Sequence, residues 1–162
     1  MVADIIQHQF EAAGLGRAPF QFVGVVMRWH QPCADAPKQP GGTCKYCGHG
    51  IAECCIIRDA DGKKFDVGNV CVEKTGDRGL VNQTKKAINA LRTEERKARE
   101  RVRIAAAREA FKRDDVIAAL HTQPHPYGHN GKCLFHYVDW LFFNGGHTGL
   151  FNAAKIIERY AK

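Results

Sequence analysis

The sequence has no long apolar run and no basic leader segment. No apolar stretch approaches the roughly 18 residues that a membrane span needs, so no membrane partner is expected. Acidic and polar residues interrupt the apolar pattern of the N-terminal segment, which is not the pattern of a signal peptide. The apolar content of 44% is too high for a wholly disordered chain. We therefore expect a folded cytoplasmic protein.

The cysteines do not form a complete set of pairs, because the chain has seven of them. An odd count argues against a full disulfide framework. In a reducing cytoplasm, a Cys-x-x-Cys pair is more often metal-binding or redox-active than a structural disulfide. Cys44 and Cys47 form such a pair, but no helix signal follows Cys47, and a thioredoxin-like redox motif lies at a strand-to-helix junction. The pair therefore predicts a metal site.

Residues 43–76 hold five of the seven cysteines and form the centre of the predicted fold. Cys44, Cys47 and Gly48 have the spacing of a zinc knuckle. In such a knuckle a tight turn points backbone N–H groups at the thiolate sulfurs, and the glycine permits a left-handed backbone. This stretch therefore predicts one structural zinc ion.

A β-hairpin is expected directly after the knuckle. Residues 51–58 and 63–67 predict two strands, and the Asp-Ala-Asp-Gly sequence at 59–62 predicts the turn between them. Cys71 follows at a turn that leads into a short helix. A knuckle, a hairpin and a cysteine near a helix start are the order of a treble-clef zinc site, so Cys71 is the predicted third ligand.

Three thiolates leave one position of a four-coordinate zinc ion open. Cys54 is the first choice for the fourth ligand, and Cys55, Cys33 and His49 are alternatives. Neighbouring residues on a strand point to opposite faces, so at most one of Cys54 and Cys55 should face the metal. Both also suit a packed core, since a free cysteine packs as a small hydrophobe. The sequence leaves the fourth ligand undecided.

The pattern CxxCG followed downstream by FxVGxxCVxK resembles a small zinc-binding module of uncharacterised bacteriophage and bacterial proteins. The matching residues are Cys44, Cys47, Gly48, Asp61, Gly62, Phe65, Val67, Gly68, Cys71, Val72 and Lys74. The resemblance extends to Thr75, Gly76 and Asp77 and to the C-terminal Pro-His-Pro and Trp140 region. It implies a structural metal and a phage origin, hence the cytoplasm of a bacterium or a phage-infected cell. It brings no defined activity.

The net charge of +7 belongs to one segment without proline or glycine. From residue 82 to 113 there are eleven Lys or Arg and four Glu, a net of +7, and the rest of the chain balances at thirteen of each sign. The helix-forming composition predicts one long helix over residues 80–113. A stripe of basic residues runs along it for about 27 Å, at about 1.5 Å per residue. The stripe consists of Lys85, Arg92, Arg96, Arg99 and Arg103.

The basic stripe has two interpretations. It fits contact with the phosphate backbone of DNA or RNA, or with an acidic protein surface. It also fits a solvated helix face in which glutamates pair with lysine and arginine at helical spacing. A narrow apolar seam on the same helix also allows a homodimer. The seam consists of Ile88, Leu91, Ala98, Val102 and Ala105.

The C-terminal segment, residues 114–162, predicts three short helices around a histidine-containing loop. Its aromatic residues are expected in the core. Cys133 and His136 have ligand-like spacing and could form a second metal site with His121, His125 or His129. However, two prolines rule out a helical face that would group these histidines, so a loop with ordinary polar histidines is the competing interpretation.

These patterns predict an α+β fold in three parts. Residues 1–79 hold an N-terminal helix, a strand and the zinc hairpin, residues 80–113 the basic helix, and residues 114–162 a helical segment that packs back on the core. The expected function is a zinc-stabilised, non-catalytic binding protein that associates with nucleic acid. No Cys2His2 spacing or RNP signature is present to read a base sequence.

Two other functions stay open. A phage-type factor could bind or inhibit a host protein through that protein's acidic surface. A metal-dependent nuclease is the third, but it needs a metal-bound histidine near the hairpin with a general base beside it. His49 is alone there, and Asp59 and Asp61 are expected to form a turn rather than an acid–base pair.

Overall fold

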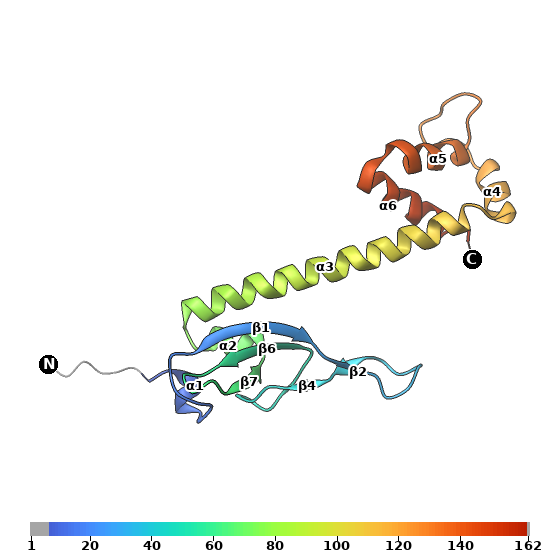
Figure 1. Cartoon of the computed structure of the whole chain (residues 1–162). Coiled ribbons are helices and arrows are strands. Elements are labelled where there is room, and N and C mark those ends of the chain that lie inside the picture. The colour runs from blue at the N-terminus through green and yellow to red at the C-terminus, as the bar shows by residue number, and fades with distance from the viewer. Residues whose placement is uncertain (1–6, 162) are drawn as a thin grey trace. The chain divides into compact units, whose positions relative to one another are not determined.

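The computed structural model describes residues 7–161, which form a mixed α+β structure (Figure 1). The chain divides into two compact units, Met1–Thr93 and Glu94–Lys162, here called unit 1 and unit 2. The division falls inside the long helix. Among the described residues, no helix is both long and apolar enough to cross a membrane.

Unit 1 is built on a three-stranded antiparallel sheet (Figure 1). β1 (Gln21–Met27) pairs with β6 (Glu53–Arg58), which pairs with β7 (Lys64–Val67). The strand expected before the zinc hairpin and the hairpin itself are thus confirmed, and a proline-rich loop (residues 31–42) lies between them. Between β1 and β6 lie two small ribbons, β2 (Trp29–His30) with β3 (Gln39–Pro40), and β4 (Gly42–Thr43) with β5 (Gly50–Ile51).

One face of the sheet is covered by short helices and aromatic rings. α1 (Gln9–Ala12) places Phe10 in the centre of the core, where no part of it is exposed. Residues 1–6 of the expected N-terminal helix lie outside the described residues. α2 (Asn69–Lys74) adds Val72 and begins at Asn69, three residues earlier than the helical turn predicted from the sequence. The core of unit 1 is therefore a sheet capped by two helices of fewer than seven residues.

The long helix α3 (Arg78–Ala110) is continuous, but it buries different faces near its two ends. Leu80, Thr84 and Ile88, at four-residue steps, are buried in unit 1. Near the other end Ala107 joins the core of unit 2. The predicted apolar seam does not form one buried line, because Val102 in the middle is 70% exposed.

Unit 2 packs α4 (Asp114–His121), α5 (Leu134–Asn144) and α6 (Gly146–Ile157) against the last turns of α3 (Figure 1). The fully buried side chains come from all three short helices. They are Val116, Leu120, Val138, Ala153, Ala154 and Ile157. The expectation that the aromatics of α5 are core residues is only partly correct, because Trp140 is half exposed and Phe143 is 80% exposed.

Candidate metal centre and basic helix

The knuckle is closed by the short ribbon of β4 and β5, in which Gly42 faces Ile51 and Thr43 faces Gly50. Inside the loop, the Cys44 N–H donates to the His49 carbonyl at 2.9 Å, and the Gly48 N–H donates to the Cys44 carbonyl at 2.8 Å. Gly48 has a φ of 76°, the left-handed backbone that favours glycine. This loop holds Cys44 and Cys47 side by side.

Cys71 reaches the knuckle from the first turn of α2. The Gly68 N–H at the N-cap of α2 donates to the Cys44 Sγ at 3.3 Å, so the helix start is tied to the knuckle. The Cys71 Sγ lies 3.4 Å from the Cys47 Sγ. The sulfurs of Cys44, Cys47 and Cys71 all lie within 4.8 Å of one another. The three predicted cysteine ligands are therefore brought together, and they could hold a metal ion.

The three thiols cannot all carry a charge at this spacing without a cation. The pKa of Cys47 is lowered to about 6, mainly by the backbone N–H of His49 and then by the Cys71 thiol. The pKa of Cys71 is raised, first by burial and then by its hydrogen bond to Cys47. These opposite directions favour the thiolate at the exposed Cys47 over the buried Cys71. A bound metal cation would replace the remaining thiol protons and balance the other charges.

Cys54, the first choice for the fourth ligand, lies outside this group. It is buried on β6, with its Sγ 3.8 Å from the Ile51 carbonyl. The sulfur fills the space beside Gly42, where a Cβ would come within 2.4 Å of it. Cys55, its neighbour on the strand, belongs to the apolar core, and burial raises its pKa to about 12. Cys33 is exposed in the proline-rich loop, also outside the group.

His49 is the one sequence candidate that contacts a member of the cluster. Its side chain lies close enough to Cys47 to lower the pKa of that thiol, in addition to the effect of its backbone N–H. The imidazole is exposed, so it has room to turn toward the three sulfurs.

Asp59 and Asp61 are engaged in the hairpin turn, as predicted. The Asp59 carboxylate is buried and accepts the Lys63 N–H at 2.8 Å. It also packs against Gly16, where a Cβ would come within 2.2 Å of it. Asp61 binds the Arg17 guanidinium through two hydrogen bonds of 2.6 and 3.1 Å. These contacts give both carboxylates a structural role.

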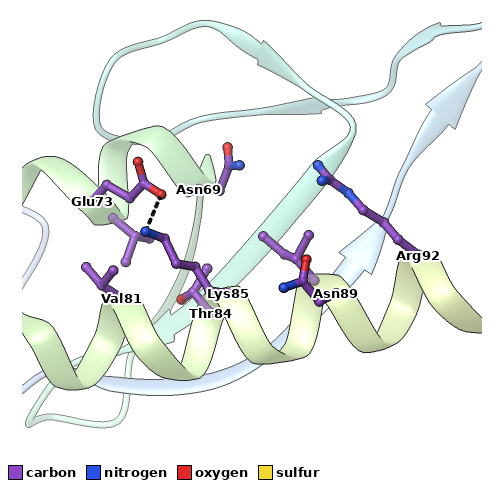
Figure 2. A pocket seen from close by; sticks show the side chains of 9 residues that line it. Asn69, Glu73, Val81, Thr84, Lys85, Asn89 and Arg92 are labelled. Carbon is purple, nitrogen blue, oxygen red and sulfur yellow. Dashed lines mark ion pairs between the residues drawn. The ribbon is translucent and has the colours of Figure 1, made fainter.

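The first two residues of the predicted basic stripe bind carboxylates within unit 1. Figure 2 shows Lys85 reaching across to Glu73 of α2, with 3.1 Å between the Lys85 Nζ and the nearer carboxylate oxygen. Arg92 makes two hydrogen bonds of 2.5 and 2.7 Å to Glu53 of β6. Both side chains line a surface pocket of about 250 Å³ between α2 and α3 (Figure 2). Their charges are balanced, so they anchor α3 rather than offer free cations.

The other three residues of the stripe lie in unit 2, and one of them is paired. Arg103 forms a two-point pair with Glu158, the C-cap residue of α6. Arg96 and Arg99 are exposed and make no ion pair with any residue between 7 and 161. Arg101 beside them is likewise exposed and unpaired within those residues. Arg78, Lys86 and Arg108 of α3 are also exposed and without an ion pair among residues 7–161, so the middle of the helix holds three of its six unpaired cations.

The sequence spacing of the stripe does not show which of its residues are paired with carboxylates, because two of these carboxylates are far away in the sequence. Arg92 and Glu53 are 39 residues apart, and Arg103 and Glu158 are 55 residues apart. No local signal in the sequence connects residues at such separations.

Comparison with protein-family models, curated proteins and solved structures finds no match to this chain. A proposal about its function therefore rests on the geometry described above.

Proposed function

We propose that this chain is a zinc-stabilised, non-catalytic protein that binds nucleic acid through the middle of α3. The observation that carries the proposal is the pair of exposed, unpaired guanidinium groups of Arg96 and Arg99, which are three residues apart and therefore lie on one face of α3. An unpaired arginine can make charge-assisted hydrogen bonds to phosphate oxygens without first breaking an internal pair. Such contacts carry no sequence information, so we expect binding that depends on charge and not on base sequence.

Zinc is the ion that fits the cysteine cluster best. Three thiolates form a soft ligand set of the kind that structural zinc sites use. The order of knuckle, β6–β7 hairpin and helix α2 carrying Cys71 is that of a treble clef. In this proposal, Cys44, Cys47 and Cys71 supply three ligands and His49 supplies the fourth. The ion ties α2 to the knuckle and so stabilises unit 1.

The fourth ligand can be identified by comparing two single variants. His49→Ala should weaken zinc binding by at least about tenfold, since even the loss of an outer contact to a ligand has an effect of that size. Cys54→Ser should leave the affinity nearly unchanged, because the Cys54 sulfur contacts the Ile51 carbonyl and lies outside the cluster. Competition with a chromophoric chelator measures both affinities. The opposite ranking would assign the fourth position to Cys54.

Nucleic-acid binding is tested with the double variant Arg96→Ala/Arg99→Ala. Each phosphate contact contributes about 0.9 to the slope of log affinity against log salt on duplex DNA. Loss of two contacts should reduce that slope by about 2 and weaken binding by about tenfold to a hundredfold near 0.1 M salt. Fluorescence anisotropy with a labelled duplex and a labelled single strand, over a salt series, gives both quantities.

The matched control is Lys112→Ala/Arg113→Ala, which also removes two exposed cations. Lys112 is paired with Glu109, and Arg113 with Asp115, so these cations are not free for phosphate. The control should change affinity much less than the Arg96/Arg99 variant. Binding that is absent at low salt, or equal loss in both double variants, would contradict the proposed site.

A protein partner with an acidic surface is the second candidate, and one observation favours it. Val102 lies 70% exposed among the free arginines, and a phosphate backbone would not bury it. A protein surface would cover this side chain while it pairs with the guanidinium groups. A stoichiometric complex that survives nuclease treatment, and that Val102→Asp disrupts, would support this function over nucleic-acid binding.

A further inference from the structure

A second group of metal-ligand side chains surrounds Cys133 in unit 2. The Cys133 Sγ lies 3.2 Å from the His121 Nδ1 and 3.1 Å from the His136 Nδ1. The three residues come from two helices: His121 is the last residue of α4, while Cys133 is the N-cap of α5 and His136 lies in its first turn. None of them belongs to the cysteine cluster of unit 1.

Helix capping accounts for only part of this arrangement. The Cys133 sulfur accepts the backbone N–H of His136, and the His136 Nδ1 accepts the backbone N–H of Cys133 at 3.2 Å. This reciprocal cap explains why Cys133 and His136 are neighbours. It does not explain His121, which arrives from another helix and is stacked on Phe135 with 4.5 Å between the ring centroids. The contact between the His121 imidazole and the Cys133 thiol therefore points to a role for this group beyond helix capping.

The chemistry of the group matches a zinc-class ion. One thiolate and two imidazoles are borderline-to-soft ligands, which favour zinc over magnesium or calcium. The spacing Cys133-x-x-His136 with a histidine at the end of the preceding helix is also of the kind seen in zinc sites. Two more imidazoles, His125 and His129, lie on the connecting loop and line a cavity of about 280 Å³ together with His136. No carboxylate lines that cavity.

We propose that His121, Cys133 and His136 bind a second divalent metal ion of the zinc class, with water in the fourth position. The ion replaces the thiol proton of Cys133, which is released to solvent, and bonds to one nitrogen of each imidazole. Among residues 7–161, only the unit 1 cluster has three ligand atoms all within 4.8 Å of one another. Binding therefore draws the two imidazoles together around the ion. Both rings are exposed, and turning them exchanges the stacking of His121 on Phe135 and the cap made by His136 for bonds to the ion.

The site would join the two ends of the loop between α4 and α5. The loop between α4 and α5 spans residues 122–133 and contains two glycines with positive φ, Gly128 and Gly131. Its ends are joined by an isolated bridge between Pro124 and Cys133. A metal ion would link the end of α4 to the start of α5 directly. The stability of small units with limited hydrophobic cores commonly depends on a structural metal ion or a similar cross-link.

Metal stoichiometry of the full chain tests the proposal. Protein reconstituted with zinc under reducing conditions and freed of excess metal should hold two equivalents, and Cys133→Ser should hold one. Cys33→Ser is the matched control, since it removes an exposed cysteine outside both groups and should keep two. His121→Ala should also hold one equivalent, and its far-UV circular dichroism shows whether the helices remain.

Cobalt substitution separates the two sites by their spectra. The unit 1 cluster contributes three thiolates and the second site one. Cys133→Ser should therefore remove the smaller part of the thiolate-to-cobalt charge-transfer absorption, and Cys71→Ser the larger part. One equivalent in the wild-type chain, or unchanged stoichiometry in folded Cys133→Ser and His121→Ala variants, would overturn the proposal. Nucleic-acid binding is not needed for either outcome.

Discussion

Replacing Cys71 with serine should remove one zinc equivalent and unfold much of unit 1. Structural zinc supplies an apparent binding free energy of about 10–16 kcal/mol in small zinc domains near pH 7. The whole stability of a typical domain is about 5–15 kcal/mol, so loss of the ion removes a contribution as large as that margin. Zinc content and thermal unfolding, followed by far-UV circular dichroism, measure the two effects.

The structure explains why this one side chain has so large an effect. Cys71 is the only member of the cluster that comes from outside the knuckle. Without metal, two hydrogen bonds tie α2 to the knuckle, one from the Gly68 N–H to the Cys44 Sγ and one between the Cys71 and Cys47 sulfurs. A helix of six residues is too short to be stable by itself, so α2 depends on its packing and on these links.

Cys33→Ser is the control for this experiment. Cys33 is exposed and lies outside the cluster, so its replacement should change neither the zinc content nor the melting temperature by a measurable amount. If folded Cys71→Ser protein retained its full zinc content and melted like the wild type, the cluster would not be a structural metal site.

Phe10→Ala should destabilise unit 1 by about 3–5 kcal/mol, the usual cost of deleting a fully buried aromatic ring. Phe10 is 0% exposed and packs edge-on against three other rings, with centroid distances of 5.6 Å to Phe20, 5.5 Å to Phe65 and 5.6 Å to Tyr46. Tyr46 lies in the knuckle itself. The substitution therefore leaves a cavity between the sheet and the knuckle, and it also releases α1.

Chemical unfolding in urea measures this change as a shift of the midpoint at constant slope. Phe143→Ala is the matched control, because Phe143 is 80% exposed and its removal should cost less than about 0.5 kcal/mol. Equal effects of the two substitutions would mean that Phe10 does not hold the core of unit 1 together.

Local patterns were sufficient to predict the central part of unit 1. The Asp-Ala-Asp-Gly turn, the alternation of the flanking strands and the cysteine spacing are short-range signals, and each corresponds to an observed element. The three cysteines of the cluster could be predicted as neighbours, because the hairpin leads the chain back to the knuckle and so brings Cys71 close to Cys44 and Cys47. The role of Phe10 did not follow, because no local pattern shows which aromatic residue occupies the centre of a core.

The long helix shows where such prediction fails. Periodicity identified the helix, but it could not show that Leu80, Thr84 and Ile88 are buried in one unit and Ala107 in another. The predicted seam assumed one buried line, whereas Val102 is largely exposed. The sequence offered His121, His125 and His129 as alternative neighbours of Cys133, and the contact of His121 depends on how α4 and α5 pack.

The two tryptophans of the chain lie one in each unit, Trp29 in unit 1 and Trp140 in unit 2. Each unit closes its own core, so the two are expected to unfold as separate cooperative transitions, and one melting temperature would not describe both. Trp29→Phe and Trp140→Phe variants leave a single fluorescent reporter in unit 2 or in unit 1. The thermodynamics of each half can then be followed in the intact molecule, without cutting α3.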